Sequence, residues 1–177
     1  MEKQNRDFRS IVGEIPTLKS ARLTFGPIRR KDIPQYNELL MDTERNRLWG
    51  YDDAAAFGDD TRPERFYEDA QKDFNEGLGI RFGVRLDDLL IGEVELHDFA
   101  EDTCEIGFRI DTAHAGSGYG YESYDRLSAW AMETFGFQSI VVRCFKENGS
   151  CHRVLEKHPD TYFDCEDEHF FQYRRKR

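Results

Sequence analysis

The segment His114-Ala115-Gly116-Ser117-Gly118-Tyr119-Gly120 lies between a stretch of alternating apolar and polar residues and a stretch with helical periodicity. Its three glycines stand at every second position, which lets successive backbone N–H groups converge on one point. The N-terminus of the following helix adds partial positive charge there. The pattern predicts a cradle for an anion such as a pyrophosphate, with a simple strand-to-helix turn as the alternative.

Two common phosphate-binding motifs do not describe this loop. No Gly-Lys-Ser/Thr sequence follows it, which distinguishes it from a P-loop. The G-x-G-x-x-G fingerprint requires a βαβ unit. Here the preceding residues alternate over 90–97 and 104–110, after a strand predicted at 80–86, which is typical of an antiparallel meander.

One face of this predicted meander is rich in ionisable residues. They are Glu93, Glu95, His97, Glu105 and Arg109. The same alternation places Ile91 with them and puts Leu90, Gly92, Val94 and Leu96 on the apolar face. Such a polar face either points to water, which is the commoner case, or lines a site.

The other periodic segments complete the predicted fold. Helical spacing predicts helices at about 32–42, from a capping box at Thr61 and Glu64 to about 77, at about 119–135, and from Asn148 to about Lys157. β-rich runs predict strands at 21–28, 139–145, 161–165 and 168–174. This order predicts an α/β fold with a mixed sheet. We interpret residues 1–19 as an N-terminal extension and residues 20–177 as a single domain.

The composition excludes several classes of protein. At 177 residues the chain fits one domain, and no apolar run approaches the roughly 18 residues of a membrane span. A formal net charge of −10 argues against binding a nucleic-acid backbone and favours cationic small molecules. The four cysteines include no Cys-x-x-Cys pair, and no metal site is predicted. With no secretory signal after Met1, we expect a cytoplasmic protein.

Six short motifs follow one another in a recognisable order over about residues 20–175. They are Ala21-Arg22-Leu23-Thr24, Trp49-Gly50-Tyr51, Ile91-Gly92-Glu93-Val94-Glu95-Leu96-His97, Glu105-Ile106-Gly107-Phe108, Gly116-Ser117-Gly118-Tyr119-Gly120 and Asn148-x-Ser150-x-x-Arg153-Val154-Leu155-Glu156-Lys157. In this order and spacing the chain resembles the GCN5-related N-acetyltransferase (GNAT) superfamily. Within it, the chain resembles the RimJ/RimL-like branch of ribosomal-protein-alanine acetyltransferases.

Two features depart from the pattern of that family. Ala115 occupies the position where the cofactor loop usually has Gln or Arg, so one side-chain contribution is missing. His158-Pro159-Asp160 follows Lys157 where the branch usually continues Leu-Gly-Phe. The second departure puts the final strands and the substrate end in doubt.

The resemblance implies a mixed, mostly antiparallel central sheet flanked by helices, with a V-shaped cofactor cleft. It implies acetyl-coenzyme A as the acetyl donor, without a metal. The pyrophosphate would lie on the N–H groups of residues 115–120, and the pantetheine would run along Phe108, Arg109 and Ile110. Asn148 would contact the pantetheine arm.

The acceptor amine must be neutral to attack a thioester, and a carboxylate can take its proton. Glu105 is the first choice for this base, with Glu93, Glu95 and His97 as alternatives. Ser150, which also belongs to the predicted cofactor site, is the candidate acid, with Tyr162 as a rival. Because a thiolate is already a good leaving group, the reaction depends mostly on proximity and orientation.

The predicted function is acetyl transfer to a primary amine, either a protein N-terminus or a small cationic amine. The acidic residues Asp52, Asp53, Asp59 and Asp60 would suit such an acceptor or would form a solvated loop. A non-catalytic acyl-coenzyme A sensor or interaction module is the alternative, and a nucleotide-binding protein is a third. A homodimer is left open, and neither a membrane nor a nucleic acid is expected as a partner.

Overall fold

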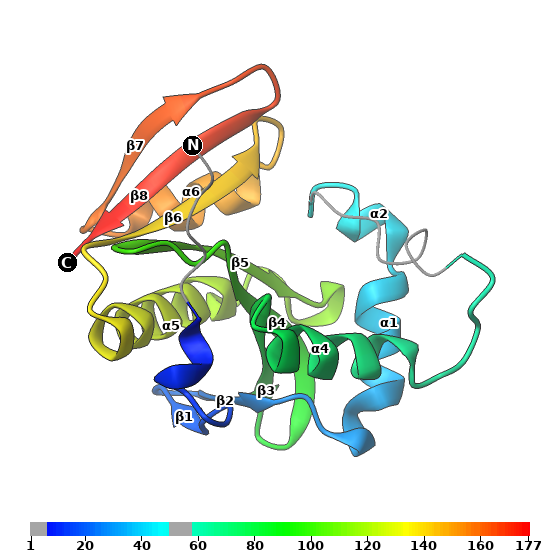
Figure 1. Ribbon diagram of the computed structural model, residues 1–177. Coiled ribbons are helices and arrows are strands. Elements are labelled where there is room, and N and C mark those ends of the chain that lie inside the picture. Colours follow the sequence, from blue (N-terminus) through cyan, green and yellow to red (C-terminus); the bar gives the residue numbers. More distant parts are fainter. Residues whose placement is uncertain (1–6, 50–57) are drawn as a thin grey trace.

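The computed structural model describes residues 7–49 and 58–177 as one mixed sheet flanked by helices (Figure 1). Gly50, Tyr51, Asp52 and Asp53 lie outside the described residues. The sheet order is β1-β2-β3-β4-β5-β6-β8-β7. The strands are β1 (Leu18–Lys19), β2 (Leu23–Pro27), β3 (Gly79–Leu86), β4 (Leu89–His97), β5 (Thr103–Ile110), β6 (Ser139–Phe145), β7 (Thr161–Glu166) and β8 (Phe170–Lys176).

The helices are α1 (Ile33–Met41), α2 (Thr43–Asn46), α4 (Arg65–Glu76), α5 (Tyr119–Phe135) and α6 (Gly149–Lys157). Within the described residues, they match the predicted ones except at the start of α4, and the short helix α2 lies outside every predicted range. Short 3-10 helices occupy Phe8–Ser10, Arg30–Asp32 and Thr112–His114. Gly136 ends α5 in the left-handed conformation, at φ 72°, as expected for a glycine after a helix. In the described residues, no helix is both long and apolar enough to span a bilayer.

The predicted antiparallel meander is confirmed by strands β3, β4 and β5. Glu93 pairs with Arg109, Glu95 with Gly107, and His97 with Glu105. The predicted alternation is wrong at the start of β4, where Arg85 pairs with Leu90 and Val84 with Gly92. This irregularity leaves Ile91 without a partner on β3, and such an extra residue reverses the facing of side chains. Ile91 therefore joins the main apolar core, whereas Leu90 packs with α1 and α4.

The two halves of the sheet separate between β5 and β6. These strands are parallel, and they pair only from Thr103–Ser139 to Glu105–Val141. Beyond this point β6 pairs with β8 alone, and β5 pairs with β4 alone, so the two strands diverge. The mixed, mostly antiparallel sheet and its V-shaped opening are thereby confirmed.

Two apolar clusters hold the helices on the sheet. The larger one joins Leu127 and Phe135 of α5 to Val94 of β4 and Ile106 of β5. The smaller one contains Tyr36, Leu39 and Leu40 of α1 and Phe66 and Ala70 of α4. Figure 1 shows α5 beneath the β5–β6 junction and α1 and α4 beside β3 and β4.

The predicted capping box at Thr61 and Glu64 is wrong. Helix α4 begins at Arg65, and the Glu64 side chain makes no capping bond. Asp60 instead accepts the backbone N–H of Arg62 at 3.0 Å and the Arg62 guanidinium at 2.9 Å, which forms a local turn before the helix. This short-range bonding competes with helix initiation at Thr61.

Residues before the predicted domain boundary contribute to the core. Phe8 is fully buried, and its ring lies 4.6 Å from that of Phe99 and 5.6 Å from that of Phe74, centre to centre. Val12 belongs to the same cluster. Residues 7–19 therefore pack on the domain, while the division at residue 19 stays a prediction.

Candidate active site

The divergence of β5 from β6 opens a cleft of about 990 Å³. Almost every residue proposed from the sequence for catalysis or cofactor binding lines it. These are Glu105, Phe108, Arg109, Ile110, Ala115, Gly116, Gly118, Tyr119, Gly120, Asn148 and Ser150. Ser117 is the exception, because it does not line this cleft. The elements α2, β5 and α6, which lie far apart along the chain, thus converge on one cavity.

The glycine-rich loop forms one end of the cleft. Gly116 and Gly118 have φ values of 76° and 82°, in the region that disfavours side chains, and Gly118 is the N-cap of α5. The ring of Phe108 lies against Gly120, and its nearest atoms are 3.7 Å from the place that a Cβ on Gly120 would take. The loop thus presents its backbone at the N-terminus of a 17-residue helix, where an anion is stabilised.

Arg22 anchors this loop from the opposite side. Its Nη1 donates to the Ser117 carbonyl at 3.0 Å, its Nε pairs with Glu122 at 2.7 Å, and its guanidinium stacks on Tyr119 at 4.5 Å. Arg22 belongs to the first of the six sequence motifs, but its residue type and position predict no site role. No local spacing reveals this role, because the contacts span 95 residues or more.

Helix α6 forms the other wall. Asn148 is its N-cap as predicted, accepting the backbone N–H of Cys151 at 3.1 Å, and its amide donates to the Leu48 carbonyl at 3.5 Å. The Ser150 hydroxyl donates to Asn148 Oδ1 at 2.9 Å. Arg153 and Lys157 also line the cleft and stand one helical turn apart. That spacing is visible in the sequence and could have indicated them.

The polar sheet face is largely buried beneath α1 and α2 rather than solvated. Glu93 is fully buried and accepts bonds from Tyr36 Oη at 2.5 Å and from Arg109 Nη2 at 2.7 Å. Arg109 Nη1 also donates to Asn46 at 3.2 Å, and its guanidinium stacks on Trp49 at 4.3 Å. Burial opposes ionisation of Glu93, but Arg109 and Arg81 keep the pKa of its carboxyl below the ordinary value. Glu93 is therefore an ionised structural anchor.

Glu95 has a different environment two residues later on the same face. Its side chain is 20 % exposed, it lines the cleft, and its Oε1 lies 3.4 Å from Arg81 Nε. Burial raises the pKa of Glu95 to about 7, against the opposing effect of Arg81. Arg81 itself is hydrogen-bonded to Asp73 of α4 at 2.7 Å.

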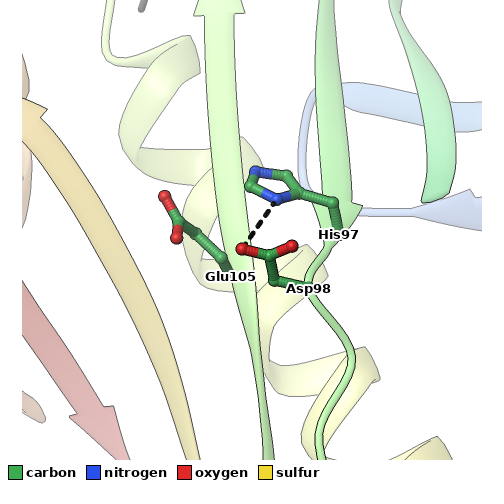
Figure 2. Close-up of side chains that lie close together, drawn as sticks. All are labelled: His97, Asp98 and Glu105. Atoms are coloured by element: carbon green, nitrogen blue, oxygen red, sulfur yellow. Dashed lines mark ion pairs between the residues drawn. The ribbon is translucent and has the colours of Figure 1, made fainter. Parts of the chain in front are cut away.

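His97 and Glu105 line the cleft, and Asp98 lies close to both of them near the β4–β5 turn (Figure 2). Their ligand-type atoms all lie within 4.8 Å of one another, and His97 Nδ1 is 3.9 Å from Asp98 Oδ2. Such partly exposed groups are common without a bound ion, so this grouping does not by itself define a metal site.

Tyr162 and His158, which the sequence analysis singles out, do not line the cleft. Tyr162 is on the edge strand β7, is 37 % exposed, and has the Lys176 ammonium 4.9 Å from its ring. His158, in the segment that departs from the family pattern, is buried and lies 3.0 Å from Asp125. The departure leaves the final strands intact, because β7 and β8 pair from Thr161 to Glu166.

A splayed mixed sheet with a glycine loop at a helix N-terminus in the opening is the architecture of the N-acetyltransferases. A family profile described as "Acetyltransferase (GNAT) domain" matches residues 22–158. The chain therefore belongs to the GNAT acetyltransferase family, as the resemblance predicted. No curated protein sequence matches the chain.

Solved structures share this fold at low sequence identity. An acetyltransferase from Agrobacterium tumefaciens is 22 % identical, with a TM-score of 0.74 over 93 % of this chain and 96 % of that one. A ribosomal L7/L12 α-N-protein acetyltransferase, RimL, in complex with coenzyme A is 11 % identical, with a TM-score of 0.76 over 91 % and 98 %. A spermidine N-acetyltransferase from Vibrio cholerae, with coenzyme A and spermine, is 17 % identical, with a TM-score of 0.71 over 88 % and 95 %.

Proposed function

We propose that this acetyltransferase moves an acetyl group from acetyl-coenzyme A to a primary amine, either a protein N-terminus or a small cationic amine. The observation that carries the proposal is the single cleft that has a backbone anion cradle at one end and carboxylates at the other. The solved RimL and spermidine acetyltransferase structures, both of which contain coenzyme A, support this reading. A cytoplasmic location and a homodimer stay predictions from the sequence.

The donor end fits the polyanionic part of coenzyme A. The N-terminus of α5 and the glycine loop supply N–H groups, and Arg153 and Lys157 on α6 supply positive charge. Arg22, held by Glu122, fixes the loop that lacks a Gln or Arg side chain at Ala115. The β5 edge beyond Glu105, unpaired with β6, offers backbone groups to an amide-bearing pantetheine chain.

The acceptor end fits a cationic amine. Glu95 and Glu105 line this end, and the net charge of the chain is −10. The neutral amine nitrogen attacks the thioester carbon, the C–S bond breaks, and the sulfur leaves with the electron pair as a thiolate. The proton lost by the nitrogen passes to a carboxylate, for which the sequence favours Glu105 because it faces the polar side of the meander near the proposed cofactor strand. Ser150 is the candidate acid for the leaving thiolate.

Thiol release from acetyl-coenzyme A in the presence of a panel of amines tests this function. The panel should contain peptides with free N-termini, spermidine and an aminoglycoside, and calorimetry should measure coenzyme A binding separately. We expect turnover with at least one amine, and loss of binding in Gly118→Glu, which places a side chain and a negative charge in the cradle.

Two results would contradict the proposal in different ways. Binding of acetyl-coenzyme A without turnover on any amine would favour the non-catalytic sensor. Binding of ATP in competition with coenzyme A, at similar affinity, would favour the nucleotide-binding alternative.

A further inference from the structure

Glu95 differs from the other acids of the polar sheet face in both its bonding and its access to the cleft. We propose that Glu95 is the group that accepts the proton of the attacking amine, a role for which the sequence favours Glu105. This inference rests on the proposed acetyl transfer and assigns one step within it. The N–C bond forms as the C–S bond breaks, and the amine proton moves to a Glu95 carboxylate oxygen.

The neighbouring acid Glu93 is unable to take this role. Its two oxygens are occupied by the Tyr36 hydroxyl and by two nitrogens of Arg109, at 2.7 and 3.0 Å. Its side chain is 1 % exposed, so no acceptor can reach it. Protonation of Glu93 would also leave the buried Arg109 charge without its counter-ion.

Glu95 has the opposite arrangement. Within the described residues, no hydrogen bond to its carboxylate is found, although four-fifths of its side chain is buried. Arg81 Nε stands 3.4 Å away but makes no hydrogen bond, because Arg81 is directed to Asp73. The oxygens of Glu95 are not among the buried polar atoms that lack a partner, so the carboxylate can bond a water, a ligand or a proton from the cleft. Its open side faces the cleft.

The register of the sheet places Glu95 next to the strand along which the pantetheine is proposed to run. Glu95 pairs with Gly107 of β5, where a larger side chain would collide with the indole of Trp49. Trp49 lies over Gly107, 3.0 Å from the place of a Cβ, and forms an apolar wall of the cleft. The next residue, Phe108, begins the stretch along which the pantetheine is proposed to run. The Glu95 carboxylate thus lies on the strand next to β5, beside the expected position of the acyl end of the donor.

The charges around Glu95 poise it for proton transfer near neutral pH. They come from β3 (Arg81), β4 (Glu93 and His97), β5 (Glu105 and Arg109), α4 (Asp69 and Asp73) and α1 (Tyr36). Burial, Glu93 and Asp73 raise the pKa of Glu95, while Arg81 and Arg109 lower it, and the result is about 7. A base with a pKa near the working pH combines availability with proton affinity.

The test is the pH dependence of kcat/KM for the 177-residue chain, with an amine whose own pKa lies below the pH range measured. We expect an acid limb near pH 7 in the wild-type protein and in Glu105→Gln. In Glu95→Gln we expect kcat to fall by about 10²-fold or more and the limb to disappear, with the Kd for coenzyme A within twofold of wild type. Asp73→Asn should move this acid limb to lower pH, because it lowers the pKa of Glu95. The substitution removes a nearby negative charge and frees Arg81 from its bond to Asp73, so that Arg81 can pair with Glu95.

The outcomes separate this assignment from the function on which it rests. An acid limb that persists in Glu95→Gln, or that disappears in Glu105→Gln, would overturn the role of Glu95 while leaving the acetyltransferase proposal standing. Absence of turnover on every amine, with coenzyme A bound, would overturn the proposed function and this assignment with it. A fully structural role for Glu95 predicts a limb at the same pH in the wild-type protein and in Asp73→Asn.

Discussion

Replacing Glu95 by Gln should make the folded protein more stable at alkaline pH. The pKa of Glu95 rises from 4.5, its ordinary value, to about 7 in the folded chain. The folded state therefore binds this proton more tightly than the unfolded state. The contribution of Glu95 to the free energy of unfolding is greatest while its carboxyl is protonated. This contribution falls as the pH rises from about 4.5 through about 7. Gln removes the ionisation and so removes this loss.

The size of the effect follows from the pKa shift. At about 1.4 kcal/mol for each pKa unit, the shift corresponds to roughly 3 kcal/mol, most of it appearing between pH 5 and pH 8.5. The side chain is only 20 % exposed, so solvent screening reduces this figure modestly. Urea unfolding of the wild-type protein and of Glu95→Gln at these two pH values measures it. If Glu95→Gln changed the free energy of unfolding equally at both pH values, Glu95 would not have the raised pKa on which this prediction depends.

Glu93→Gln is the matched contrast, since it makes the same chemical change two residues away on the same sheet face. Here the folded carboxylate is ionised and bonded to Tyr36 and Arg109. Its loss leaves a buried guanidinium unpaired, which costs about 3–5 kcal/mol. The two variants should therefore change the urea midpoint at pH 8.5 in opposite directions. A shared direction would show that the bonds of Glu93 to Tyr36 and Arg109 do not make its ionised form stabilising.

Further predictions concern the donor end of the cleft. Arg22→Ala should raise the Kd for coenzyme A about 3–10-fold in calorimetry, because it frees the loop at the Ser117 carbonyl. The control Arg126→Ala should leave this Kd unchanged, because in the described chain the Arg126 guanidinium bonds only the Lys19 carbonyl. Gly118→Ala should weaken binding by straining a residue at φ 82°, by about 1 kcal/mol, and unaltered affinity would show that the loop tolerates a Cβ. Arg153→Ala and Lys157→Ala should each weaken binding more at low than at high salt; equal losses would mean that neither charge meets the phosphates.

The local elements could be read from the sequence because their signals are local. Helix α5 begins and ends at the predicted residues since its apolar repeat and its glycine stop lie within the segment. The error at Thr61 arose because Asp60 made a competing short-range turn. The error at Ile91 arose because the bulge depends on the pairing of β4 with β3, which no alternation pattern contains.

The family, the order of the elements and the glycine loop could be predicted from the sequence alone, because they depend on residue type and spacing. Tertiary structure alone distinguished the acids of the polar face. Glu93 and Glu95 have the same chemistry and the same alternation, and only packing places one against Arg109 and the other at the cleft. A carboxylate's pKa depends on its burial and on charges brought from distant parts of the chain. For that physical reason the choice of base among Glu93, Glu95 and Glu105 required the folded protein.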